Sequence, residues 1–143
     1  MQNIAIGSDH AGFHQKEIIK DHLIAKGYFV HDLGPYNAES VDYPDYAHQV
    51  ANAVLSKENT LGILLCGSGN GVCLTANKHA GVRAALCWLA ELGKLAKQHN
   101  NANILCLPAR YINNDLAIEI TDAYLSATFE GERHKRRVEK IDL

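Results

Sequence analysis

The chain has 143 residues and contains no apolar run long enough to cross a membrane. Its longest apolar stretch, residues 82–90, is interrupted by Arg83, whereas a spanning helix needs about 20 apolar residues. The apolar segment at residues 4–6 is too short for the core of a signal peptide. These absences predict a protein without membrane segments, located in the cytoplasm.

Paired cysteine motifs are also missing. The four cysteines stand at positions 66, 73, 87 and 106, with no C-x-x-C pair and no spacing typical of a zinc site. Without a secretion signal, a disulfide framework is not expected. The sequence therefore predicts reduced thiols and no structural metal.

The chain has almost no excess charge, since 14 basic and 16 acidic residues give a net charge of −2. A general nucleic-acid-binding protein carries a basic field, which this composition lacks. Hydrophobic residues make up 47% of the chain, enough to close one core. We expect residues 1–143 to form a single domain.

Short apolar runs alternate with segments of helical periodicity. Strands are predicted at residues 4–6, 28–30, 61–66, 82–86 and 104–107. Helices are predicted at residues 13–26, 45–56, 72–79, about 92–99, 116–127 and about 132–140, the last strongly basic. This alternation is typical of an α/β Rossmann-like three-layer fold, with a five-stranded parallel sheet and helices on both faces.

Ligands of open parallel sheets bind beyond the carboxyl ends of the strands. The strand-end residues are therefore the first candidates for a site, namely Asp9, His10, the segment 66–71 and Arg110. Two residues at a helix end, His99 and Asn100, join this list.

The segment 66–71 contains three glycines between a buried strand and a helix. Such a loop lets several backbone N–H groups point at one anion, and the helix start adds partial positive charge. It is neither a dinucleotide fingerprint nor a P-loop, because Val72-Cys73 follows the last glycine. A plain tight turn is an equally good interpretation.

Cys66 ends the strand before this loop, where a helix N-terminus favours the thiolate. Beside an anion cradle, a thiolate can attack a carbonyl or remove a carbon-bound proton. The alternative is a small buried side chain. We adopt that alternative for Cys73, Cys87 and Cys106.

The basic groups leave similar alternatives open. His99 is either a packed cap or a group that titrates near neutral pH. Arg133 and Arg137 are four residues apart, so both can bind one phosphate, although a solvated helix face has the same pattern. A nucleic-acid site here is the weaker reading, because no aromatic residues are interleaved.

Six motifs in order resemble those of the ribose-5-phosphate isomerase B family, which also includes galactose-6-phosphate isomerase subunits. They are GSDHAGF at 7–13, DYPDYA at 42–47, CGSGNG at 66–71, ANK at 76–78, QHN at 98–100 and GERH at 131–134 with Arg137. The resemblance extends from residue 3 to about residue 141.

The resemblance implies a metal-independent, cofactor-free aldose–ketose isomerase that interconverts ribose 5-phosphate and ribulose 5-phosphate through a 1,2-enediolate, in the pentose phosphate pathway. Cys66 would be the base that moves the proton between C2 and C1. His99, helped by Asp9, would open the furanose ring. Ser68 would pass a proton between the enediolate oxygens.

The remaining family roles concern substrate binding. The amides of Gly67, Ser68, Gly69, Asn70 and Gly71 would hold the enediolate oxygens. His10, Arg133 and Arg137 would hold the phosphate, with Arg110 as a weaker candidate. Asp9, Tyr43 and Asn100 would contact the sugar.

The resemblance also implies a homodimer, or a tetramer, in which His99 and Asn100 come from the neighbouring subunit. Some family members use a glutamate at the position of Val72 as the base, so here Cys66 would act alone. The alternatives are an isomerase for allose or galactose 6-phosphate and a non-catalytic phosphosugar-binding module.

Overall fold

The computed structural model describes residues 2–143 and contains a five-stranded, all-parallel sheet in the order β2-β1-β3-β5-β4. The strands are β1 (Asn3–Ser8), β2 (Phe29–Asp32), β3 (Thr60–Cys66), β4 (Ala84–Leu86) and β5 (Ile104–Pro108). All seven residues of β3 are buried, as expected for a central strand covered on both faces. The predicted fold class is confirmed.

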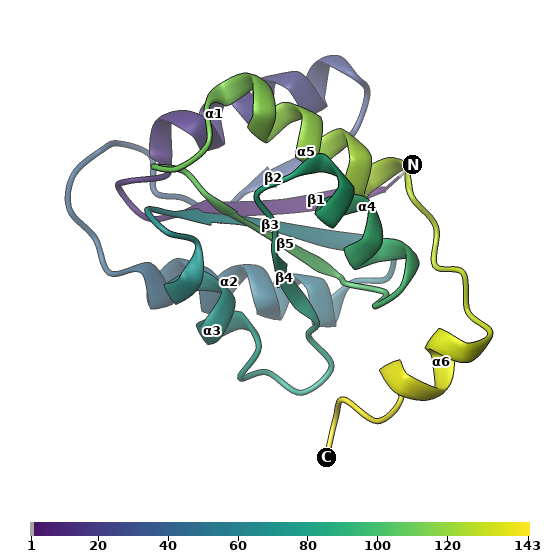
Figure 1. Ribbon diagram of the computed structural model, residues 1–143. Helices are drawn as coiled ribbons and strands as arrows, with labels where there is room; N and C mark the ends of the chain where they lie inside the picture. Colours follow the sequence, from purple (N-terminus) through teal and green to yellow (C-terminus); the bar gives the residue numbers. More distant parts are fainter. Residues whose placement is uncertain (1) are drawn as a thin grey trace.

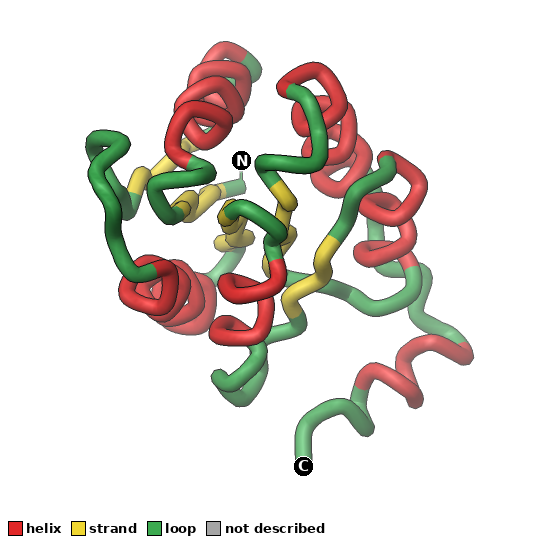
Figure 2. The backbone as a smooth tube through the Cα atoms, turned by 60° about the vertical axis from the view of Figure 1, so that its left-hand side comes forward, coloured by secondary structure: helices red, strands yellow, loops and turns green. Residues whose placement is uncertain are grey.

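Six helices cover the sheet or follow it within the described residues. They are α1 (Phe13–Ala25), α2 (Tyr43–Ser56), α3 (Asn70–Ala76), α4 (Ala90–Gln98), α5 (Asn114–Ser126) and α6 (Arg133–Val138). Figure 1 shows α1, α4 and α5 on one face and α2 and α3 on the other. The view in Figure 2 separates the same layers, with the strands between them.

The two faces of the sheet carry separate apolar clusters. On the face of α1, α4 and α5, the cluster includes Ile19, Leu23 and Ile120, all fully buried. On the opposite face, Val50 and Val72 pack from α2 and α3. These side chains recur at helical spacing, which is why their periodicity predicts the covering helices.

Several predicted boundaries were wrong, each for a local reason. The second helix begins at Tyr43 rather than 45, because Pro44 is well suited to a first turn. The third helix begins at Asn70 rather than 72, because Gly69 turns the chain with a φ of +76°. Asn70 and Gly71 therefore belong to the first turn of α3.

Two further boundaries differ near the end of the chain. The strand predicted to begin at residue 82 begins at Ala84, because the Arg83 N–H bonds the Asn103 side chain instead of a strand partner. The last helix begins at Arg133 rather than 132, since Glu132 has a φ of +50°. This short helix extends away from the body of the sheet, on the side of the N-terminus (Figure 1).

Candidate active site

Three neighbouring strands end at one edge of the sheet, and their loops bind one another. The Asp9 N–H donates to the carbonyl of Leu65 (3.1 Å), which ties the loop after β1 to the end of β3. The Arg110 N–H donates to the carbonyl of Gly67 (3.0 Å), which ties the loop after β5 to the same place. The predicted gathering of Asp9, Cys66 and Arg110 at the carboxyl edge is confirmed.

Cys66 is the last residue of β3 and is only 5% exposed. It belongs to the apolar cluster beneath α2 and α3, so its thiol is more deeply packed than its place beside a loop suggests. The described chain contains no disulfide, and all four cysteines are free. Cys87 and Cys106 are buried as predicted, whereas Cys73 is half-buried.

The glycine loop after Cys66 is held by close packing. A Cβ atom at Gly69 would overlap Leu86 and would lie 3.1 Å from the carbonyl carbon of Leu107. Ser68 is exposed, and its Oγ accepts a hydrogen bond from the Asn70 N–H (3.3 Å). The loop is therefore a tight connection that leads into the first turn of α3, and its role as an anion cradle stays a prediction.

Asp9 and His10 are each fixed by a backbone donor. The buried Asp9 carboxylate accepts a hydrogen bond from the Gly12 N–H (3.1 Å). His10 Nδ1 accepts one from the Val41 N–H (3.2 Å), so a neutral His10 ring carries its proton on Nε2. That Nε2–H is a donor suited to an anionic group.

Two further predicted residues contact the glycines of the same edge. Tyr43 opens α2, and its ring lies against Gly71, where a Cβ atom would come within 2.7 Å of Tyr43 Cζ. The Arg110 side chain lies along Gly67, with Nη1 about 3.2 Å from the position of a Cβ. Both glycines thus give room to side chains that the sequence predicts to bind substrate.

The remaining candidates lie at the opposite edge. Helix α4 starts after the carboxyl end of β4 and ends before β5 begins. His99 and Asn100 therefore lie at the amino edge, the edge of the sheet at which the strands begin. Asn100 lines a cavity of about 390 Å³ together with Asn77 and Asp142. Within one chain these helix-end residues are therefore separated from the strand-end residues, because a helix returns the chain to the start of the next strand.

Helix α6 belongs to the amino edge as well. The ring of His134 stacks on that of His99, with centroids 4.2 Å apart and planes 12° apart. His134 lies between Arg133 and Arg137, both exposed, so His99 and the two arginines form one group. One chain therefore carries two separate sets of predicted site residues.

Comparison with known proteins adds to this geometry. A model of the family described as Ribose/Galactose Isomerase matches residues 4–141. The chain belongs to the ribose/galactose isomerase family. It is 46% identical to the Escherichia coli K12 ribose-5-phosphate isomerase B, over 99% of this chain and 95% of that protein. The predicted resemblance is confirmed.

Solved structures of this isomerase family have the same fold. The chain is similar to a ribose 5-phosphate isomerase from Thermotoga maritima, with a TM-score of 0.96 and 53% identity, covering 99% of this chain and 97% of that one. It is also similar to ribose-5-phosphate isomerase B from Mycoplasma genitalium with bound ribulose-5-phosphate. There the TM-score is 0.93 and the identity 49%, over 97% and 93% of the two chains.

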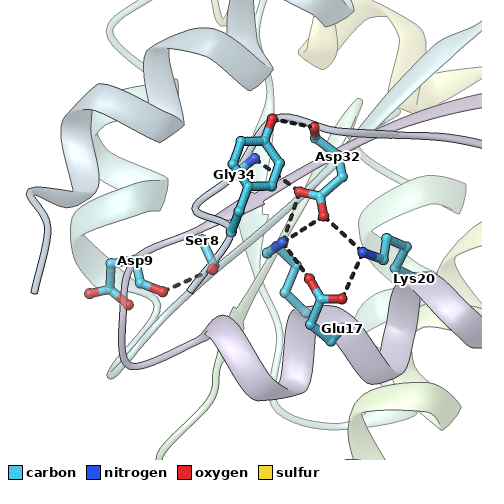
Figure 3. A network of polar contacts seen from close by, with 8 residues as sticks. Ser8, Asp9, Glu17, Lys20, Asp32 and Gly34 are labelled. Atoms are coloured by element: carbon cyan, nitrogen blue, oxygen red, sulfur yellow. Dashed lines mark hydrogen bonds and ion pairs between the residues drawn. The ribbon is translucent and has the colours of Figure 1, made fainter. Parts of the chain in front are cut away.

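A buried charge network supports the carboxyl edge of this isomerase fold. Lys16 is fully buried, and its Nζ lies 2.8 Å from the Asp32 carboxylate and 2.9 Å from that of Glu17. Lys20 contacts both acids too, at 3.0 Å and 2.7 Å (Figure 3). The sequence reasoning missed this network, since lysine is among the residues least often buried.

The network reaches the site through a turn. Asp32 Oδ1 accepts a hydrogen bond from the Gly34 N–H (2.9 Å), and the Gly34 carbonyl accepts one from the Ser8 N–H (3.0 Å), next to Asp9. Burial raises the pKa of Asp32, but the hydrogen bonds from Lys16, Gly34 and Lys20 outweigh it and hold that pKa below its usual value. The carboxylate therefore stays charged while it holds the turn.

One cluster at the amino edge has metal-ligating side chains. Ligand atoms of His99, Glu130 and His134 lie within 4.8 Å of one another. Tetrahedral zinc requires ligand lone pairs that converge on one point. The two imidazole planes are nearly parallel, so their lone pairs run side by side and do not converge. In this arrangement the cluster holds the His99 ring and is not a formed metal site.

No helix among residues 2–143 is long and apolar enough to cross a membrane.

Proposed function

We propose that this protein is a ribose-5-phosphate isomerase of type B, which interconverts ribose 5-phosphate and ribulose 5-phosphate. The observation that carries the proposal is the gathering of a carboxylate, a thiol and a glycine loop at the carboxyl edge, in a chain of this family. The three groups supply a hydrogen-bonding acid or base, a proton-transfer base and N–H donors for an oxyanion.

In the proposed reaction, the Cys66 thiolate removes the proton from C2 of the open-chain aldose and returns it to C1. The negative charge moves onto the oxygen of the carbonyl group, and the N–H groups of residues 67–71 stabilise it there. A carbon acid beside a carbonyl is too weak to ionise unaided, and loss of one such donor typically costs about 3 kcal/mol of transition-state stabilisation. Ser68, exposed at the loop, transfers the proton between O1 and O2.

The other roles follow the positions of the side chains. Asp9 and His99 open the furanose ring, and Tyr43 and Asn100 contact the sugar. His10 donates its Nε2–H to the phosphate, and Arg110, Arg133 and Arg137 add charge to that site. All of these groups act without a bound cofactor or metal in this scheme.

We further propose that the active enzyme is a homodimer with shared sites, and that a tetramer would be built from such dimers. Support comes from the separation of the two sets within one chain, since His99 cannot reach Cys66 across the sheet. In a symmetric dimer, the amino edge of one subunit faces the carboxyl edge of the other, and two equal sites form. His99, Asn100, Arg133 and Arg137 then come from one subunit, while Asp9, His10, Tyr43, Cys66 and Arg110 come from its partner.

The proposed setting is the non-oxidative branch of the pentose phosphate pathway in the cytoplasm. The cysteine spacing supports this setting, since it contains no C-x-x-C pair and predicts no disulfide framework.

The test of the function is proton exchange in heavy water. Wild-type protein incubated with ribose 5-phosphate should yield ribulose 5-phosphate with loss of the C2 proton, and Cys66→Ala should lower the rate at least a hundredfold while remaining folded. Cys87→Ala, which removes a buried thiol from the apolar cluster on the other face of the sheet, is the matched control. Ligand-dependent thermal stabilisation without any exchange would instead show a binding module. Comparing kcat/KM for ribose, allose and galactose phosphates then fixes the substrate size.

A further inference from the structure

The proposed ring-opening residue His99 has two close neighbours that no predicted role uses. Its Nε2 lies 3.3 Å from the Glu130 carboxylate, and its ring stacks on that of His134. Because Nε2 faces this carboxylate, Nδ1 is the ring nitrogen that remains for a substrate. His99 itself is 36% exposed and caps the C-terminal end of α4.

Both neighbours are anchored to the same helix end. The Glu130 N–H donates to the carbonyl of Gln98 (3.0 Å), which fixes Glu130 beside His99. Gly131 and Glu132 then turn the chain with φ values of +72° and +50°, and this turn brings His134 back over the His99 ring. The stacking of His134 on His99 thus depends on the backbone conformation of this turn as well as on the rotamers of the two side chains.

His134 is also unusual in its burial. It is 9% exposed, and its Nε2 has no hydrogen-bond partner in the structure. A buried polar atom without a partner is costly, so the ring must be held there by its stacking contact. Burial and the neighbouring groups His99 and Arg133 lower the pKa of His134, which favours the neutral form of its ring.

We propose that Glu130 and His134 are positioning residues for His99. The Glu130 carboxylate pairs with Nε2 at 3.3 Å and limits the rotation of the ring, while the face of His134 fixes its plane. Nδ1 is thereby directed to the sugar of the partner subunit, where it exchanges protons during ring opening. This inference rests on the proposed function of His99.

The test compares a substrate that has a ring with one that has none. Ribose 5-phosphate closes to a furanose, whereas ribulose 5-phosphate cannot, because its O5 is esterified. Glu130→Gln and His134→Ala should each lower kcat for ribose 5-phosphate about tenfold, with KM within twofold of wild type. Exchange of the C1 proton of ribulose 5-phosphate in heavy water should stay within twofold, because this reaction includes no ring-opening step by His99.

Two variants separate positioning from simple structural damage. His134→Phe keeps a stacking face and lacks the unpaired nitrogen, so it should retain at least half of the wild-type kcat. Glu139→Gln removes an exposed carboxylate next to the same helix and should change neither reaction. Glu130→Asp should recover part of the rate that Glu130→Gln loses.

The outcomes distinguish this inference from the function on which it rests. If His99→Ala lowers the ribose 5-phosphate rate but Glu130→Gln and His134→Ala do not, the positioning role is wrong and the function stands. Equal losses in both reactions would also overturn the inference, since they indicate general damage. If His99→Ala itself keeps the wild-type rate, the proposed role of His99 fails first.

Discussion

The two edges of the sheet hold their candidate residues by different means. At the carboxyl edge, loops from three strands bind one another through backbone hydrogen bonds, and the glycine loop is packed without spare room. At the amino edge, His99 is held by a stacked ring and one carboxylate, and α6 extends away from the sheet. The first arrangement suits a proton transfer that needs fixed donors, and the second suits a group that enters a neighbouring subunit in the proposed dimer.

The largest expected effect is the recovery of activity when two inactive variants, each with a defect at a different edge, are mixed in one dimer. Cys66→Ala and His99→Ala should each be nearly inactive, but refolding them together should restore activity. Half of the dimers formed are mixed, and each mixed dimer has one intact site of two, so about a quarter of the wild-type rate returns. Steady-state assays of the mixture and of each parent measure this.

The control is a mixture of Cys66→Ala with Cys66→Ser, in which no intact site can form. A mixture of the first pair that stays at the level of its parents would mean that Cys66 and His99 do not act across subunits.

A smaller effect should show that the two edges differ in packing, and it is measured as the loss of stability when a glycine is replaced by alanine. Gly69 and Gly131 have similar φ values of +76° and +72°, but a Cβ at Gly69 meets Leu86 and Leu107, whereas one at Gly131 meets nothing within 4 Å. Gly69→Ala should therefore lower the free energy of unfolding by roughly 3 kcal/mol, and Gly131→Ala by about 1 kcal/mol of backbone strain. Urea denaturation measures both, and equal losses would contradict the difference in packing.

The smallest effect concerns the acid sensitivity of the carboxyl edge. The pKa of Asp32 is lowered in the folded protein, so its stabilisation is complete above the unfolded value of about 3.9 and is lost as the pH falls through the folded value. Asp32→Asn should lower the Tm at pH 7 and flatten its decline below about pH 4.

Thermal unfolding between pH 7 and pH 3 measures this prediction. Glu139→Gln, at the exposed C-cap of α6, makes the same charge change and should leave the curve unaltered. A decline with the wild-type slope in Asp32→Asn would show that other carboxylates dominate acid unfolding.

Much of the fold follows from local pattern. Apolar runs such as residues 61–66 predict strands because a parallel strand is covered on both faces, and the spacing of Ala47, Val50, Ala51 and Val54 predicts α2. The boundaries near Gly69 and Glu132 were missed, because positive φ values are set by tertiary packing as well as by residue type. The burial of Lys16 was missed for a similar reason, since its partner Asp32 lies on another element.

The candidate site was predictable only in part. Asp9, Cys66 and Arg110 follow strands, and the rule for parallel sheets places them together. The same rule places the end of α4 at the other edge, a consequence that sequence reasoning could have drawn for His99. The stacking of His134 on His99 depends on the path of residues 129–134, which has no periodic signal.

Because Cys66 and His99 lie at opposite edges of the sheet, a single chain carries two partial sets of proposed site residues that cannot meet within that chain. If the sites are shared, only dimers are active, so the reaction rate at high dilution is proportional to the square of the free monomer concentration. Specific activity should therefore decline on dilution below the dissociation constant of the pair, although every chain remains folded.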